Sequence, residues 1–580
     1  MGYPEHKQEA YTNLGGMNTK ASRYITPEGQ ALRLVNFDFT KPGAWTKVPG
    51  STLFLGATVS GSIGGIDQFS RLSGASYLIV SANTNLYNVT SGAFNAIRTG
   101  LKDGALFDFV PFVDRLFCAN GQDFFKTDGT SASKYSLPPG ATGLSVAAGS
   151  GTGLTGFFQY AYGYLNDRGY YGPVGNFVGA SIANTNPILT GFTTPTDYGI
   201  TSLIIYRSEN NQSANVFRIG SAAAGSATFV DTGFTLQSAI NPPYLWFTLA
   251  PRYLEIFANS LFMAGFSSAP STVFFSAIGE PEGVGATASF EVRTNDGDRL
   301  TGFVPYFGQL LIGKTKSFHT LSGDNPQNYT LKEVSLEYGC LANHAFAVFL
   351  DRCHFLDSKG VIEYNGANVQ VASTPVEDVF LRMNVEAAID NAFMMHIKQR
   401  NEVWTLIPVD GATMNNQLVV YDYNANSWYE RRGLNIRTLS LVQTDLPYPY
   451  PFYGGYTGSL FKFGPTFAGD NGSGMTSLVL TRFHPGEGHS TESMFRRLWF
   501  DVDPQPASVG GTVSISIKFY ANQGLSAPVL ERTIYGATFQ TRIDFGVPGR
   551  DIAFEFAHFS ETQALRINGY TISHRFQRNV

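Results

Sequence analysis

Glycine-punctuated hairpins that recur along the chain predict an all-β protein organised around a β-propeller. About seven such units follow one another and, apart from one long insertion, their spacing is roughly 40 to 50 residues, the period of four-stranded propeller blades. An inserted β-sandwich and a carboxy-terminal β-sandwich or jelly roll complete the predicted fold class. Divergent repeats of this kind also fit stacked sandwiches, so that alternative stays open.

The stretch from Asp351 to Gly366 (DRCHFLDSKGVIEYNG) is the clearest copy of the repeating hairpin. Cys353 to Leu356 has the apolar character of one strand and Val361 to Tyr364 that of the next, and the polar residues between them predict a tight turn. The other strand pairs are Tyr77–Val80 with Leu86–Tyr87, Arg115–Ala119 with Phe124–Phe125, Ser260–Ala264 with Val273–Phe275, Gln309–Gly313 with Ser317–Phe318, Val403–Ile407 with Leu418–Tyr421, and Phe452–Tyr453 with Leu460–Phe461.

The composition fits aromatic strands joined by glycine turns. The 580 residues include 47 Phe, 29 Tyr and 62 Gly, but only 15% are charged, well below the usual quarter or so. So few charges on a large surface suggest that partner subunits cover part of it, although β proteins rich in Ser, Thr and Asn can also be soluble with few charges. The net charge of −5 argues against nucleic-acid binding driven by the overall charge of the protein.

Four regions follow from these patterns. Residues 1–142 are expected to form an N-terminal arm and the first propeller blades, 143–243 an inserted sandwich, 244–470 the remaining blades, and 471–580 the carboxy-terminal sandwich. Alternating apolar positions mark strands in the two sandwiches, and the glycine-rich run AGDNGSG from Ala468 to Gly474 is the expected linker. These positions are Phe158, Tyr160, Tyr162 and Tyr164 in the insert, and Val513, Ile515, Ile517, Phe519, Ile552, Phe554 and Phe556 near the end.

One short helix is expected in this otherwise β chain. In the run Ser373 to Glu377, Thr374 is a suitable N-cap, Pro375 suits the first helical position, and Glu377 follows three residues after the cap.

Two blocks of residues carry a resemblance to a known family. The first consists of Asn13, Gly15-Gly16, Asn18-Thr19, Asn36, Gly43, Lys47 and Pro49-Gly50, and the second of Gly279–Glu282, Asn295–Asp298, Leu300–Phe303, Gly313–Phe318, Leu321–Gly323, Asp351–Gly366 and Val369–Glu377. Both blocks resemble propeller-bearing tail proteins of short-tailed bacteriophages, namely the tail nozzle, or tail tubular protein B, and related tail-hub proteins, and the second block is the more specific. One departure occurs in the first block, where the family often has Arg before the closing Gly and this chain has Val48-Pro49.

The resemblance covers most of residues 11 to 470 and implies a structural role in the virion. It implies a homo-oligomeric ring, of six subunits, that sits below the portal and adaptor, contacts tail fibres or spikes, and forms the distal channel for genome ejection. Genomic DNA would pass without specific binding. The insert is similar to the fibronectin-type-III-like domains that many phage tail proteins carry inside a propeller. The chain would be made in the host cytoplasm and end in the phage tail.

Two other function classes stay open: a tail-associated protein that binds glycans or a host receptor, and a propeller glycosidase. A glycosidase needs carboxylates that converge near the propeller axis. The pairs Glu280 with Glu282 and Asp351 with Asp357 are the candidates, but no Asp-box repeat, GxSxG elbow, P-loop or dinucleotide fingerprint accompanies them. We therefore expect no enzyme activity.

No catalytic, cofactor-binding or metal site is predicted, and no cofactor is expected. Asn295–Asp298 lacks the length and the final glutamate of an EF-hand loop and fits a hairpin turn better. Arg496-Arg497 lies between Phe495 and Trp499, as in single-strand binders, but one basic pair is no patch. Neither the histidines nor the three cysteines have metal-ligand spacing, and no run is apolar enough to span a membrane. These residues are His484, His489, His558, His574, Cys118, Cys340 and Cys353.

Overall fold

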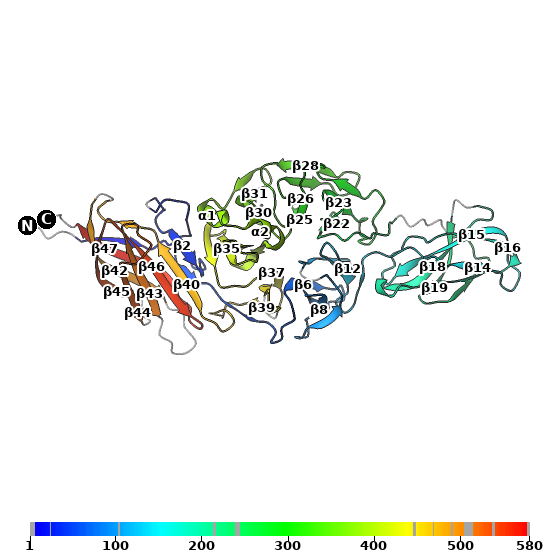
Figure 1. Ribbon diagram of the computed structural model, residues 1–580, viewed down its shortest axis with the longest axis horizontal. Helices are drawn as coiled ribbons and strands as arrows, with labels where there is room; N and C mark the ends of the chain where they lie inside the picture. Colours follow the sequence, from blue (N-terminus) through cyan, green and yellow to red (C-terminus); the bar gives the residue numbers. More distant parts are fainter. Residues whose placement is uncertain are drawn as a thin grey trace, which may run out of the picture.

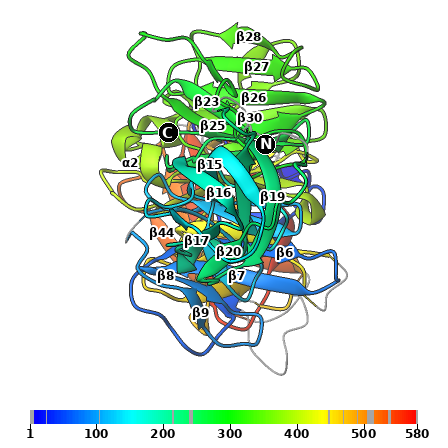
Figure 2. The same cartoon turned by 90° about the vertical axis from the view of Figure 1, so that its right-hand side faces the viewer.

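The computed structural model is almost entirely β and consists of three bodies in a row (Figure 1). A carboxy-terminal sandwich lies at one end, the propeller in the middle and the inserted sandwich at the other end. The view along the row, from the insert, shows the insert in front of the propeller (Figure 2). The described residues are 6–23, 25–102, 105–212, 216–237, 244–444, 448–467, 469–488, 491–503, 514–535 and 540–576.

In the part of the chain that the structure describes, the propeller consists of seven blades of four strands each. The inner strand of each blade contacts that of the next, and β37 contacts β6, which closes the ring. Blade by blade, the strands are β6 (Ile63–Ser70), β7 (Ser76–Ala82), β8 (Asn85–Asn88), β9 (Asn95–Arg98); β10 (Asp108–Phe112), β11 (Arg115–Ala119), β12 (Phe124–Thr127), β13 (Ala132–Lys134); β21 (Tyr253–Phe257), β22 (Ser260–Ala264), β23 (Thr272–Phe275), β24 (Ser289–Glu291); β25 (Leu300–Tyr306), β26 (Gln309–Lys314), β27 (Phe318–Ser322), β28 (Thr330–Ser335); β29 (Phe346–Phe349), β30 (Arg352–Asp357), β31 (Gly360–Tyr364), β32 (Val369–Val371); β33 (Phe393–Ile397), β34 (Glu402–Ile407), β35 (Gln417–Asp422), β36 (Ser427–Arg431); and β37 (Thr438–Val442), β38 (Tyr450–Gly454), β39 (Leu460–Phe463) with β5 (Ser51–Leu53).

Each of the predicted hairpins is the second and third strand of one blade, so the propeller prediction is confirmed. The apolar side chains of these strands are buried between neighbouring blades. One cluster joins Phe262 of blade 3 to Leu310 and Ile312 of blade 4, and another joins Val80 of blade 1 to Phe452 of blade 7. Burying each such side chain stabilises the fold by roughly 1.5–3 kcal/mol. The core is therefore a ring of clusters between blades.

An amino-terminal strand completes the last blade. β5 pairs antiparallel with β39, and the Ser51 hydroxyl lies 2.9 Å from the hydroxyl of Tyr453 on β38, the next strand of the blade. At Gly50, a Cβ atom would lie 1.9 Å from the carbonyl oxygen of Gly469, so only glycine fits. This pairing ties the two ends of the propeller segment together and leaves the ring without an open seam.

The insert is a fibronectin-type-III-like sandwich of a three-stranded and a four-stranded sheet. The four alternating aromatic residues predicted for its long strand β15 are all buried in its core. Its strands are β14 (Ser145–Ala147), β15 (Leu154–Asn166), β16 (Val178–Thr185), β17 (Ile188–Thr190), β18 (Ile200–Ser208), β19 (Val216–Ala223) and β20 (Thr228–Val230), with the 3-10 helix η1 (Thr196–Tyr198) before β18.

The carboxy-terminal sandwich includes the amino-terminal arm. One sheet has the order β3-β4-β47-β42-β45, with β1 on β47, and β2 pairs with β40 in the other sheet. β2 also pairs with β36 of blade 6, which joins sandwich and propeller in one ten-stranded sheet. The strands are β1 (Lys7–Tyr11), β2 (Ala31–Val35), β3 (Phe37–Asp38), β4 (Trp45–Lys47), β40 (Met475–Thr481), β41 (His484–Pro485), β42 (Ser493–Asp503), β43 (Ser514–Ala521), β44 (Leu530–Tyr535), β45 (Gln540–Gly549), β46 (Asp551–Ser560) and β47 (Arg566–Phe576).

The expected boundaries group the N-terminal arm with the first propeller blades in residues 1–142, whereas in the structure the strands of the arm pair within the two sheets of the carboxy-terminal sandwich. The predicted strand positions Ile515, Ile517, Phe519 and those in β46 are buried as expected, and the linker lies between β39 and β40. Val513 and Ala468 lie outside the described residues.

The predicted helix is present, but it is not capped as expected, and a second helix follows it. Pro375 lies in the first turn of the 3-10 helix η2 (Thr374–Val376), which leads into α1 (Glu377–Leu381), and no side chain caps η2. A second helix, α2 (Val385–Asn391), was not predicted; the side chain of Asn384 caps it by accepting from the Ala387 amide. The 3-10 helix η3 (Lys398–Arg400) lies in the turn between β33 and β34.

Candidate functional site

A cavity of about 610 Å³ opens at the propeller axis, on the face where the inner strands begin; we name it the axial cavity. The residues that line it come from five of the seven blades, which places the cavity around the axis. Its lining consists of Ala105, Leu106, Asn120, Gly121, Gln122, Arg252, Tyr253, Gly265, Phe266, Ser267, Pro270, Arg299, Leu300, Asp390, Asn391 and Arg437. Concave openings of this kind are the usual location of small-molecule sites.

Three arginines occupy the same position in different blades. Arg252, Arg299 and Arg437 each come directly before the first residue of an inner strand, β21, β25 and β37. Two of them have a main chain fixed by their own blade: the amide of Arg252 donates to Ala264 O at 2.9 Å and that of Arg437 to Gly454 O at 2.8 Å. The blade architecture thus holds three guanidinium groups at one cavity.

The three guanidinium groups have different surroundings. The guanidinium of Arg252 donates to Asp390 Oδ1, at the end of α2, over 2.6 Å. The side chain of Arg437 is buried and donates to the Ser62 hydroxyl, whereas that of Arg299 is exposed. Among the residues that the structure describes, the cavity lining therefore carries three cations and a single carboxylate.

Carboxyl groups lie on the inner strands behind this cavity. Asp108 on β10 accepts from the Leu254 amide at 2.8 Å and from Asn343 Nδ2 at 2.9 Å. Burial raises its pKa, while the nearby His344 opposes that rise. Asn343 and His344 line a smaller pocket that shares Arg252 and Asp390 with the axial cavity, so Asp108 lies just below the arginines.

Two further carboxyl groups on neighbouring inner strands have pKa values near or above neutral pH. Burial raises the pKa of Glu255 on β21 to about 8, and that of Asp67 on β6 to about 7, with the charge of Asp108 adding to both. Ile256 N donates to Glu255 Oε1 at 2.9 Å. A protonated carboxyl group can donate a hydrogen bond as well as accept one.

The carboxylates considered for a glycosidase do not converge at the axis. Glu282 is buried where the insert meets blade 2, bonded to Lys126 and Asn166, and Glu280 accepts from the Tyr244 hydroxyl. Asp351 and Asp357 lie at opposite ends of β30, and Asp357 accepts from the Gly339 amide.

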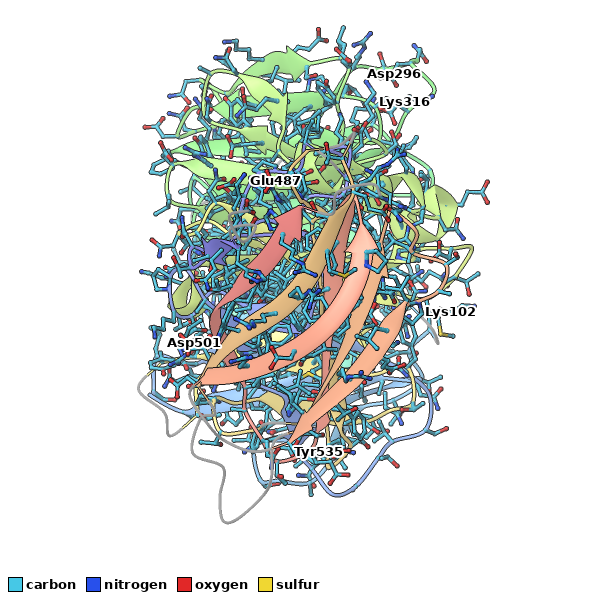
Figure 3. All side chains as sticks on the ribbon, turned by 90° about the vertical axis from the view of Figure 1, so that its left-hand side faces the viewer. Lys102, Asp296, Lys316, Glu487, Asp501 and Tyr535 are labelled. Carbon is cyan, nitrogen blue, oxygen red and sulfur yellow. The ribbon has the colours of Figure 1, made fainter. Side chains whose placement is uncertain are left out.

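The other residues considered have structural contacts. Asp296 pairs with Lys314 and Asp298 accepts from Thr315 and the Lys316 amide, so the carboxylates of Asn295–Asp298 are engaged within their own blade. Figure 3 shows Asp296 and Lys316 together at the rim of the propeller, behind the sandwich. Among the described residues, no group of three His, Cys, Asp or Glu is placed to hold a metal ion.

The remaining residues behave as structural groups of the strands. Arg497 pairs with Asp544 on the neighbouring strand β45. His484, His558 and His574 are buried in the sandwich, and His489 lies outside the described residues. Cys118, Cys340 and Cys353 are free and buried. In the described part of the chain, no helix is long and apolar enough to cross a membrane.

A second cleft, of about 310 Å³, lies between blades 6 and 7 and the amino-terminal arm. Arg400 crosses it, bonded to Asp38 at 2.6 Å and to Glu402 at 2.9 Å. Since both carboxylates are buried and paired with this arginine, the cleft is a joint between the arm and the propeller.

Sequence reasoning missed the axial arginines although a signal was present. Placing the hairpins in register puts Arg252, Arg299 and Arg437 at one equivalent position, directly before an apolar strand. The carboxyl groups of Asp67, Asp108 and Glu255 left no such signal, because each occurs at a different position of its strand.

Comparisons with known proteins identify no family. No family model and no curated protein matches the chain. Among solved structures it is similar to the WD40 domain of SCAP from fission yeast (8% identity, TM-score 0.30, covering 71% of this chain and 97% of that one). It is also similar to the Pan2 WD40 domain of Neurospora crassa (8%, 0.26, 70% and 89%) and to BBS1N in complex with ARL6DN (11%, 0.27, 71% and 94%). At these TM-scores the similarities carry no functional argument.

Proposed function

We propose that this chain is a structural virion protein, the subunit of the ring-shaped tail nozzle or hub of a short-tailed phage. In this role six copies form the distal channel for genome ejection below the portal and adaptor, and DNA passes without specific binding. The observation that carries the proposal is the row of three bodies with direct bonds at both joints, because an extended subunit of this kind suits the wall of a channel.

The joint between the insert and the propeller supports this role. Arg98 on β9 binds Asp197 of the insert with two parallel hydrogen bonds of 2.9 and 3.0 Å. Beside it, the buried pair of Lys126 and Glu282 is joined by Asn166, whose Nδ2 donates to Glu282 Oε2 at 2.6 Å. Bidentate and buried pairs fix an orientation better than single exposed pairs do.

The joint at the other end is a continuous sheet. Val35 of β2 pairs with Glu430 of β36, so the sandwich continues the sheet of blade 6. The bond from Arg400 to Asp38 adds a side-chain link across the same joint. A shared sheet together with an ion pair resists hinge motion, in contrast to a glycine-rich linker alone.

Exposed apolar side chains on one face of the propeller also support assembly. Leu72, Phe307 and Leu350 are 91%, 70% and 66% exposed, and all three lie in turns that join an inner strand to the second strand of its blade. Phe307 and Leu350 have φ values of 42° and 49°, which bulky residues rarely adopt. Such strain costs about 1–3 kcal/mol per residue and is expected where the side chain has a partner.

Antibody labelling of virions tests the proposed location. Purified particles of the phage that encodes this chain are treated with antibodies against the isolated protein and viewed by electron microscopy. We expect label on the tail tip alone. Label on the capsid, or particles without this protein, would contradict the proposal.

A further inference from the structure

We infer that the axial cavity binds a small anion that also carries hydroxyl groups, that is, an acidic sugar or a sugar phosphate. This site is separate from the proposed tail role, which needs no small ligand. The inference rests on the charge of the cavity, on the partners of its arginines, and on its size and floor.

The charge of the lining favours an anion. Among the described lining residues, Arg252 and Arg299 bring two guanidinium groups to the cavity beside one carboxylate, Asp390. Arg437 adds a third guanidinium group, which donates to the Ser62 hydroxyl. Within the described part of the chain, the exposed guanidinium of Arg299 forms no ion pair. Guanidinium groups bind carboxylate and phosphate oxygens in pairs of parallel hydrogen bonds.

The pair of Arg252 and Asp390 can give way to a ligand. Both side chains are partly exposed, at 31% and 60%, so a ligand anion can take the place of the Asp390 oxygen on the guanidinium. An ion pair in that environment contributes little net stability, and little free energy is lost in the exchange. Asp390 therefore competes with the ligand for Arg252.

Hydroxyl partners and an apolar floor suit a sugar ring. Gln122 and Ser267 at the rim are exposed, and their amide and hydroxyl groups suit sugar hydroxyls. Tyr253, Phe266 and Leu300 form the buried apolar part of the lining. The volume of about 610 Å³ lies in the range of small-molecule sites and exceeds what a single inorganic ion needs.

A nucleic acid is a poorer fit. Binding a strand requires a row of cations along a groove, with aromatic side chains between them. Here three cations surround one axial cavity, and the rest of the chain is mildly acidic. This arrangement fits one anionic group and the ring attached to it.

Calorimetric titration of the full-length protein tests the inference. Glucuronic acid and glucose 6-phosphate are the two anionic probes, and glucose is the neutral one. We expect binding of at least one anionic probe, no binding of glucose, and an affinity that falls as salt is added. The two arms distinguish a carboxylate from a phosphate as the recognised group.

Variants with opposite expected effects make the test specific. Arg299→Gln should weaken binding roughly tenfold or more, because it removes a charge-assisted bidentate contact from an exposed side chain. Asp390→Asn should strengthen binding several-fold, because it frees Arg252. Arg382→Gln, at an exposed arginine paired with Asp410 and outside the cavity, is the control and should leave the affinity unchanged.

Three results would overturn the inference. The first is the absence of binding for both anions at concentrations up to about 10 mM, a range that detects even weak sites. The second is binding of glucose as strong as that of the anions. The third is an unchanged affinity in both Arg299→Gln and Asp390→Asn. None of these results alters the expected mass of the assembled ring, so failure here is distinguishable from failure of the proposed tail role.

Discussion

Replacing Glu255 by Gln should remove a pH-dependent loss of propeller stability. Burial and the nearby Asp108 raise the pKa of Glu255 from 4.5 to about 8 in the folded protein. The folded state therefore keeps a proton that the unfolded chain loses above pH 4.5. It follows that the stability contributed by this group is complete below that pH and declines as the pH rises toward 8.

The magnitude follows from the two pKa values. At 1.36 kcal/mol per pH unit, the difference between 4.5 and about 8 sets an upper bound of about 5 kcal/mol above pH 8. The side chain is partly exposed, and structural relaxation lowers the cost, so we expect about 2–4 kcal/mol. The amide of the Glu255→Gln variant would keep a carbonyl acceptor for the Ile256 amide, which now donates at 2.9 Å.

Hydrogen exchange in increasing urea gives the required readout for one blade. Exchange of peptides that cover β21 to β23 is followed by mass spectrometry at pH 5 and at pH 8.5, with intrinsic exchange rates corrected for pH. The Glu255→Gln variant should exceed the parent protein in unfolding free energy at pH 8.5 and match it at pH 5. The control Glu386→Gln, at an exposed glutamate of α2, should change neither value. An advantage of Glu255→Gln that is equal at both pH values would refute the reasoning.

Three further predictions concern the joints and the exposed turns. Lys126→Met or Glu282→Gln alone should destabilise the protein by about 3–5 kcal/mol, because each leaves a buried charged group without its charged partner. The double variant Lys126→Met with Glu282→Leu should cost less than either single change, and urea unfolding distinguishes these outcomes. Phe307→Asn and Leu350→Asn should stabilise the isolated chain by about 1 kcal/mol, since Asn tolerates positive φ, and should weaken assembly; unchanged assembly would remove these turns from the interface. Gly50→Ala should open the pairing of β5 with β39 and speed amide exchange there, and unchanged exchange would contradict the close contact with Gly469.

Local patterns predicted the propeller because each blade hairpin is a contiguous signal. Asp351 to Gly366 contains both strands and their turn, and no distant residue is needed to recognise it. Pairings across the whole chain could not be predicted in the same way. β5 meets β39, and β1 meets β47, although each pair is far apart in the sequence, and several strands offered equivalent apolar edges.

The candidate site was only partly visible in the sequence. The shared position of Arg252, Arg299 and Arg437 was available once the blades were in register. By contrast, the raised pKa of Glu255 depends on its burial beside Asp108 of another blade, which no pattern within one strand records. α2 was missed because seven residues give too little periodicity, even though Asn384 is a good N-cap.

The mass of the purified protein in solution tests the proposed ring most directly. Light scattering is measured on the chain alone and then with the adaptor ring that the proposed tail role implies. The account predicts a hexamer, formed alone or on the adaptor. A chain that remains a monomer of 63.2 kDa in both measurements would contradict it.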